Sequence, residues 1–146
     1  MERLIKSKEL LEYFENRFGL GGTIFSGMNF YAAGKKRIFL SSARPVQENP
    51  VIVGLAVARI GKKGSIKPTT AMIQLFGKYA SKNILEISRE QAIDYVNGKD
   101  LENVAGASDG YVIVRYKNYD LGCGLLRNNY LKNMLPKKKR LDVTIL

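Results

Sequence analysis

Residues 109–140 decide the fold, and they read DGYVIVRYKNYDLGCGLLRNNYLKNMLPKKKR. Residues 111–116 and 120–126 show the alternation of β-strands, and a shorter strand is expected at 130–131. The pairs 117–118 and 128–129 predict the turns, because asparagine tolerates left-handed backbone angles. A last strand is expected at 141–145. The pattern predicts a run of short β-strands in this half of the chain.

Basic residues crowd the same stretch. It holds eight lysines and arginines against two aspartates, a local net charge of +6. Such a cluster attracts a polyanion, and the tyrosines among the cations favour a nucleic acid over a bare phosphate. The candidate RNA-binding residues are Arg115, Tyr116, Arg127, Lys132, Asn133, Lys137, Lys138, Lys139 and Arg140.

Composition limits the class of protein. The 146 residues are 45% apolar, enough for one domain or for two small ones that share a core. The net charge of +11 fits a nucleic-acid, lipid or acidic-protein partner, and by itself does not choose among them. The single cysteine cannot form an intramolecular disulfide, so we expect a cytoplasmic protein. No window approaches the roughly 20 apolar residues that span a bilayer, so no membrane partner is expected.

The first half predicts helices around a small sheet. Residues 7–18 place apolar side chains on one helical face, and Gly19 follows as a C-cap. Residues 23–42 predict two or three short antiparallel strands, and 51–60 predict another. Pro68 suits the first turn of a second helix, whose apolar face extends to residue 79. The basic turns at 35–37 and 62–63 are interpreted most simply as solubilising, with phosphate contact as the alternative.

A polar break at 81–83 is the candidate module boundary. A strand is expected at 83–87, and Ser88 and Gln91 have the spacing of a capping box, which predicts a helix that ends at Gly98.

Several spaced motifs of the second half resemble a known family. They are Tyr95-Val96-Asn97-Gly98, Gly110-Tyr111, Leu121-Gly122-x-Gly124, Leu131-Lys132-Asn133 and Pro136-Lys137 followed by Arg140. Their order resembles the PUA-like RNA-binding domain at the C-terminus of Fmu/RsmF-type ribosomal-RNA cytosine-5 methyltransferases. The first half is similar in outline to the pre-PUA module that precedes PUA domains.

The resemblance implies an α+β fold in which a pre-PUA-like module, residues 1–81, packs on a PUA-like mixed β-barrel, residues 82–146. It implies structured RNA, ribosomal or transfer, as the partner, and a methyltransferase or a ribosome-assembly factor is a further candidate partner. We expect a non-catalytic RNA-binding protein that assists RNA modification or ribosome assembly. The alternative is a protein-interaction adaptor for a separate methyltransferase.

Several candidate residues keep two interpretations. Gly122 and Gly124 either bring backbone close to RNA or permit a bulge or tight packing. The basic run 137–140 is either a solvated tail or a phosphate clamp. Tyr116, Tyr119 and Tyr130 either stack on bases or pack in the sheet, and we expect one of them to be exposed.

Catalysis and cofactors are not expected. Cys123 lies between two glycines in a chain without histidine, so a buried, inert thiol is favoured over a nucleophile. The sequence shows no metal-ligand cluster, no phosphate-binding glycine loop and no glycine-rich turn for S-adenosylmethionine.

Overall fold

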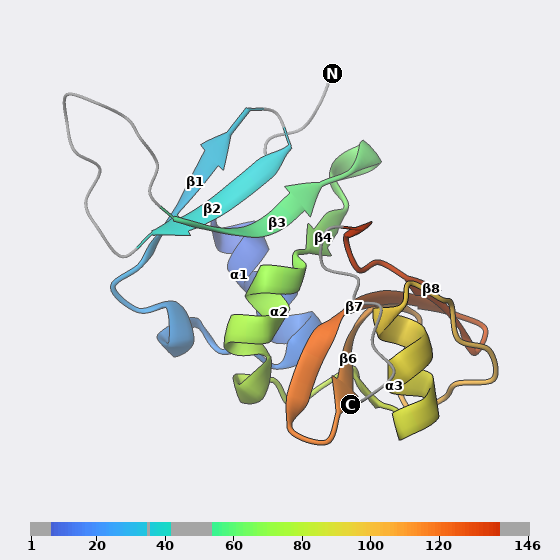
Figure 1. The fold of residues 1–146 in the computed structure, drawn as a ribbon. Helices are drawn as coiled ribbons and strands as arrows, with labels where there is room; N and C mark the ends of the chain where they lie inside the picture. The colour runs from blue at the N-terminus through green and yellow to red at the C-terminus, as the bar shows by residue number, and fades with distance from the viewer. Residues whose placement is uncertain (1–6, 35, 42–53, 138–146) are drawn as a thin grey trace.

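The computed structural model describes residues 7–34, 36–41 and 54–137, which form two four-stranded sheets and three α-helices (Figure 1). In chain order the elements are α1 (Ser7–Phe18), the 3₁₀ turn η1 (Gly22–Phe25), β1 (Asn29–Ala33), β2 (Arg37–Ser41), β3 (Leu55–Ile60), η2 (Lys62–Gly64), β4 (Ile66–Pro68), α2 (Thr70–Phe76), η3 (Gly77–Tyr79), β5 (Ile84–Glu86), α3 (Arg89–Val96), β6 (Gly110–Tyr116), β7 (Tyr119–Arg127) and β8 (Tyr130–Asn133).

The N-terminal sheet has the antiparallel order β1-β2-β3-β4. Helix α1 confirms the predicted span and ends at Gly19, whose φ of 70° gives the left-handed cap that glycine supplies. Residues 22–25 form a 3₁₀ turn where a strand was expected. The start of the strand expected at 51–60 and the basic residue 35 lie outside the described residues.

The predicted start of the second helix is wrong. Pro68 ends β4, and α2 begins two residues later, because the Thr69 hydroxyl caps it by accepting a hydrogen bond from the Met72 amide at 3.0 Å. The apolar face predicted to reach residue 79 is also only partly buried, since Leu75 is 51% and Tyr79 52% exposed.

The C-terminal sheet has the order β5-β6-β7-β8, with β5 parallel to β6 and the other pairs antiparallel. The predicted turns are confirmed. Asn128 and Asn129 both have positive φ, as expected for asparagine, whereas in the first turn the positive φ belongs to Lys117. The predicted capping box is present, since the Ser88 hydroxyl accepts from the Gln91 amide and the Gln91 side chain accepts from the Ser88 amide.

The α+β class is confirmed, and a closed barrel is not shown. Within the described residues the ladder of the C-terminal sheet begins at β5 and ends at β8, with one further bridge between Leu101 and Leu131. The strand expected at 141–145 lies outside the described residues.

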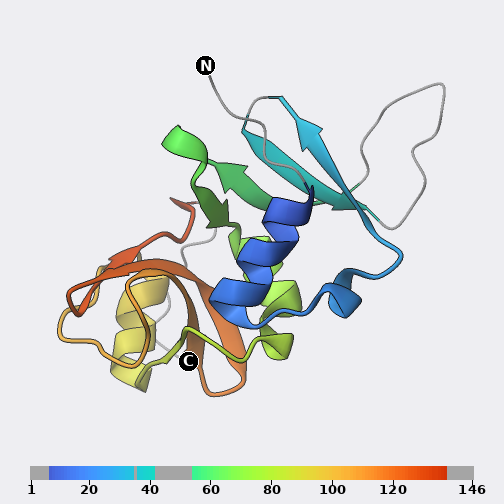
Figure 2. The same cartoon turned by 180° about the vertical axis from the view of Figure 1, so that it is seen from behind.

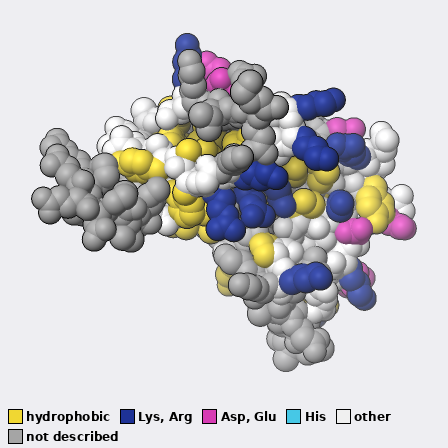
Figure 3. All heavy atoms as spheres, turned by 90° about the horizontal axis from the view of Figure 1, so that it is seen from above, with side chains coloured by type: hydrophobic (Ala, Val, Ile, Leu, Met, Phe, Trp, Pro, Cys, Tyr) yellow, Lys and Arg dark blue, Asp and Glu magenta, His cyan; other side chains and the backbone are white. Residues whose placement is uncertain are grey.

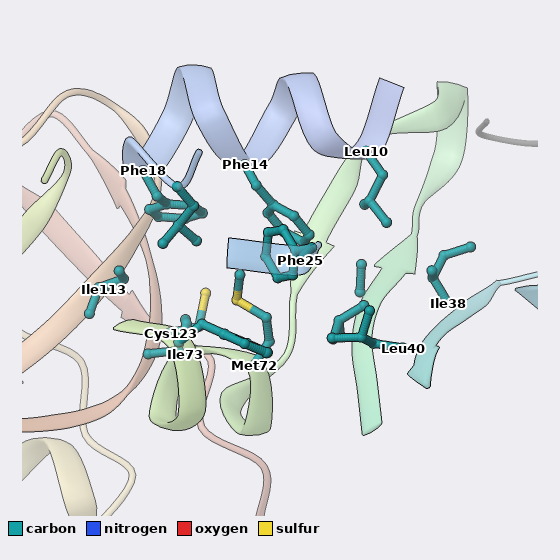
Figure 4. Packing of buried hydrophobic residues seen from close by; sticks show 14 of the residues in the cluster. Leu10, Phe14, Phe18, Phe25, Ile38, Leu40, Met72, Ile73, Ile113 and Cys123 are labelled. Carbon is teal, nitrogen blue, oxygen red and sulfur yellow. The ribbon is translucent and has the colours of Figure 1, made fainter. Parts of the chain in front are cut away.

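One buried cluster joins the two sheets. Figure 4 shows side chains of α1 facing those of α2, with Ile38 and Leu40 at one end and Ile113 and Cys123 at the other. Helix α2 contacts both β3 and β7, and it lies between the two sheets when the molecule is seen from either side (Figures 1 and 2). The division at residue 81 stays a prediction, because residues from both sides of it share this core.

The other face of the C-terminal sheet carries a second buried cluster. It includes Tyr95 of α3, Leu126 of β7 and Leu131 of β8. The C-terminal sheet is therefore a layer with apolar packing on both faces.

Candidate nucleic-acid interface

Three predicted cations of the C-terminal half are exposed: Arg127, Lys132 and Lys137. Arg127 ends β7 opposite Tyr130, and Lys132 on β8 lies opposite Leu125. Because alternate residues of a strand share a face, Arg127, Tyr130 and Lys132 lie on the same face of the sheet. No ion pair between any of the three cations and a described carboxylate is present. These charges are available to an anionic partner.

Tyr130 presents a fixed aromatic ring beside these cations. It is 43% exposed, and its hydroxyl donates a hydrogen bond of 2.7 Å to the Asp100 carboxylate. That hydrogen bond raises the pKa of Tyr130 and directs its hydroxyl toward Asp100. An oriented, exposed ring can stack on an unpaired base.

The other two candidate tyrosines differ in exposure. Tyr119 is 67% exposed at the β6–β7 hairpin, whereas Tyr116 is buried, with the Lys117 ammonium 5.3 Å from its ring centroid. Two tyrosines are thus exposed where one was expected. Tyr116, which was a candidate for base stacking, packs in the fold instead, because it points into the apolar cluster under α3.

Arg115 is engaged inside the protein. A bulge after Val114 places Arg115 opposite Asp120, and its Nε donates to the Asp120 carboxylate at 2.6 Å. Its Nη2 donates to the carbonyl of Gly77 at 2.9 Å, and the side chain is only 18% exposed. The guanidinium ties the hairpin to η3, and two of its donor nitrogens are used inside the protein.

Asn133 is also satisfied by the fold. Its Nδ2 donates to the carbonyls of Tyr95 at 2.7 Å and Lys99 at 2.9 Å, while its Oδ1 accepts from the Leu135 amide at 2.8 Å. The residue is 7% exposed. Its amide joins the end of α3 to β8, and reading a base edge would require breaking these bonds.

Gly122 and Gly124 make room for core side chains. A Cβ at Gly122 would lie 2.6 Å from the Tyr95 hydroxyl, and one at Gly124 would collide with the side chain of Leu131. Both glycines are buried. Of the two interpretations, tight packing is the one that this geometry favours.

A second group of cations forms a row across the N-terminal sheet. Arg37 on β2 pairs directly with Arg59 on β3, and Arg59 pairs directly with Lys67 on β4. Direct partners lie about 5 Å apart on one face, and like charges placed there destabilise a sheet. Figure 3 shows Lys and Arg side chains gathered in the middle of the view from above, beside hydrophobic ones.

Sequence reasoning missed this basic row, meaning Arg37, Arg59 and Lys67. Arg37 was assigned to a turn interpreted as solubilising, with phosphate contact as the alternative, and the other two residues were not singled out. The available signal was Arg59, the one charged residue in the otherwise apolar strand β3. Its partners depend on long-range register, which local periodicity does not contain.

Cys123 lacks the properties of a nucleophile. It is 1% exposed, and burial raises the pKa of its thiol to about 12, so it is protonated at neutral pH. Within residues 7–34, 36–41 and 54–137, no group of three or more His, Cys, Asp or Glu side chains could hold a metal ion. No helix in the described part of the chain is both long and apolar enough to cross a bilayer.

Residues 82–141 match the family model of the methyltransferase RsmF PUA domain. This match confirms the resemblance seen in the sequence, and it covers β5 to β8 with α3. The residues 138–140 of the predicted clamp fall within the match but outside the described residues.

Curated proteins are similar to this chain over more than the matched segment. Ribosomal RNA small subunit methyltransferase F of Psychromonas ingrahamii is 27% identical over 139 residues, 91% of this chain and 28% of its own length. The proteins of the same name from Shewanella sp. (strain ANA-3) and Aeromonas hydrophila are 36% and 34% identical over 64% and 59% of this chain. The chain spans 28% or less of the length of these relatives, and the first alignment includes most of the N-terminal half.

Proposed function

We propose that this chain is a non-catalytic RNA-binding protein that recognises structured ribosomal or transfer RNA and assists RNA modification or ribosome assembly. The observation that carries the proposal is the match of residues 82–141 to a PUA domain whose curated relatives are named for ribosomal RNA. The exposed cations and the fixed ring of Tyr130 lie within that segment.

Arg127, Lys132 and Lys137 neutralise phosphates in this mechanism, and Tyr130 stacks on an unpaired or distorted nucleotide. Lys138, Lys139 and Arg140 extend the phosphate contact. Arg115, Tyr116 and Asn133 hold the surface in place from inside the fold. The buried, protonated thiol of Cys123 supports a role without covalent chemistry.

The test is a salt titration of affinity for small-subunit ribosomal RNA, total transfer RNA and a single-stranded control of equal length. We expect a steep salt dependence together with a preference for one structured RNA. Equal, weak affinity for all three would contradict the proposal.

An adaptor function is the second candidate. Leu75 and Tyr79 are more than half exposed on α2 and η3, where apolar side chains could meet a methyltransferase. Co-purification with a methyltransferase that survives nuclease and high salt, and is abolished in Leu75→Ser with Tyr79→Ser, would favour this function over RNA binding.

A further inference from the structure

We infer that the outer face of the N-terminal sheet is a second RNA-contacting surface, on which the basic row binds phosphates and the pair Tyr31 and Phe39 stacks on an unpaired base. The inference rests on the proposed function and extends it to a face that the family match does not cover, since the matched segment begins at residue 82.

The basic row points away from the core. On β2, Ile38 and Leu40 are buried in the cluster with α1, whereas Arg37, which precedes them, is exposed. On β3, Ala58 and Ile60 are buried and Arg59 is exposed. The alternation therefore turns the cations of both strands outward.

Two aromatic rings share this outer face. Tyr31 on β1 pairs directly with Phe39 on β2, and Phe39 is two residues from Arg37. Both rings are half-buried, and neither belongs to the two buried clusters of the described residues. By contrast Phe30, their neighbour on the other face, packs against Phe25 in the core. Aromatic rings beside cations form a stacking platform for single-stranded nucleic acid.

A hollow lies where the ring of Phe39 meets the cations. It has a volume of about 520 Å³ and is lined by Ala33, Gly34, Lys36, Arg37, Phe39 and Arg59. The small residues at the end of β1 leave room above the sheet, and three of the six lining residues are basic. Three cations beside an aromatic ring suit a planar group that carries negative charge, which is the chemistry of a nucleotide.

The described residues do not neutralise the basic row. No ion pair joins Arg37, Arg59 or Lys67 to a described carboxylate, although neighbours in the row repel each other. A bound polyanion would relieve that repulsion. The row spans roughly 10 Å over three strands, so it can contact more than one phosphate.

The row also reaches toward the C-terminal cations. Ile66 of β4, the neighbour of Lys67, packs against the same buried cluster as Cys123 of β7. Cys123, Leu125 and Arg127 alternate on one face of β7, and Lys132 is the partner of Leu125. Both views show β4 beside the chain that follows β8 (Figures 1 and 2). One RNA can therefore contact both surfaces.

The test compares salt slopes for small-subunit ribosomal RNA. The row variant is Arg37→Gln, Arg59→Gln and Lys67→Gln together. The control is Lys78→Gln, Lys82→Gln and Arg89→Gln, three exposed cations whose replacement removes the same charge. We expect the row variant to bind at least about tenfold more weakly at low salt, with a slope of log K against log salt shallower by about 2 to 3. The control should keep the wild-type slope, and circular dichroism checks that both fold.

The aromatic pair is tested by Tyr31→Ala with Phe39→Ala against the control Tyr79→Ala. We expect affinity to fall roughly fivefold to a hundredfold with the salt slope unchanged, because stacking involves no counterion release. If the folded double variant binds RNA with wild-type affinity, the two rings are not part of the RNA-contacting surface.

Failure of the inference is distinguishable from failure of the proposed function. If the wild-type protein binds RNA with a steep salt dependence and the row variant has the same slope and affinity, the second surface is wrong and the proposed function stands. If the wild-type protein does not bind RNA, both fall.

Discussion

At the residue scale, two neighbours on one strand have different roles: Lys132 is available to a ligand, and Asn133 stabilises the fold. They are neighbours on β8, yet Lys132 is exposed and Asn133 is 7% exposed with three internal hydrogen bonds from its side chain. Both are candidate RNA contacts from sequence, because a lysine beside an asparagine supplies a cation and an amide. The alternation of the strand sends them to opposite faces, and only Lys132 remains available.

This separation predicts opposite phenotypes for the two residues. Asn133→Ala should lower the free energy of unfolding by about 2–3 kcal/mol, because it leaves buried carbonyls and an amide unpaired. Lys132→Ala should change it by less than about 0.5 kcal/mol and should weaken RNA binding. Urea unfolding and RNA titration on both variants make the comparison. If the Asn133→Ala protein is as stable as wild type but binds RNA more weakly, Asn133 contacts RNA directly and the structural role is wrong.

The buried thiol of Cys123 predicts a dependence of stability on pH. Burial raises its pKa from 9.0 to about 12, so its contribution to stability is complete below about 9 and disappears as pH rises toward 12. Urea unfolding between about pH 8 and 11 should therefore show falling stability, with a smaller fall in Cys123→Ala. The ring of Tyr13 adds to the decline above about pH 10, since burial raises its pKa as well. If stability falls with pH equally in wild type and in Cys123→Ala, the raised pKa of the Cys123 thiol is wrong.

At the element scale, the β6–β7 hairpin is held against η3 by Arg115. The pairing depends on the bulge after Val114, which sets Arg115 opposite Asp120. The same guanidinium reaches the Gly77 carbonyl, at a glycine where a Cβ would lie 2.7 Å from the Asp120 carboxylate. The hydrogen bond joins two elements through residues 38 positions apart in the sequence.

Removing the Arg115 side chain should cost stability and leave RNA binding unchanged. We expect Arg115→Ala to lower the free energy of unfolding by about 1.5–3 kcal/mol, because the hydrogen bonds involve a charged group. The matched control is Lys117→Ala, an exposed cation in the same hairpin. A drop of RNA affinity in folded Arg115→Ala beyond that of the control would indicate a direct contact with RNA.

Local signals predict the elements well, and long-range pairing is the part they miss. Helix α1 follows from apolar spacing and a C-cap glycine, and the Asn128-Asn129 turn follows from asparagine's tolerance of positive φ. Strand β4 has three residues and ends in proline, so it gives little periodicity. The side chains of Asn133 and Arg115 donate hydrogen bonds to carbonyls 34 to 38 residues away in the sequence, and no local pattern specifies these partners.

At the scale of the whole molecule, the two sheets behave as one packed unit. Ile113 and Cys123 of the C-terminal sheet lie in the same cluster as Phe14 and Phe18 of α1. Arg17 adds polar ties, since its guanidinium donates to the carbonyls of Tyr111 at 2.7 Å and Ser108 at 2.6 Å. Such sharing fixes the exposed cations of the two sheets relative to each other, which would preorganise the two proposed RNA-contacting surfaces for one ligand.

The central claim is that exposed cations of this fold bind RNA phosphates. The most direct measurement is the slope of log K against log salt for small-subunit ribosomal RNA, compared between wild type and the variant Arg127→Gln, Lys132→Gln and Lys137→Gln. We predict a steep wild-type slope that becomes shallower by about 2 to 3 in the folded variant, because each substitution removes one cation that displaces a counterion from a phosphate. A folded variant with the wild-type slope and affinity would contradict the claim.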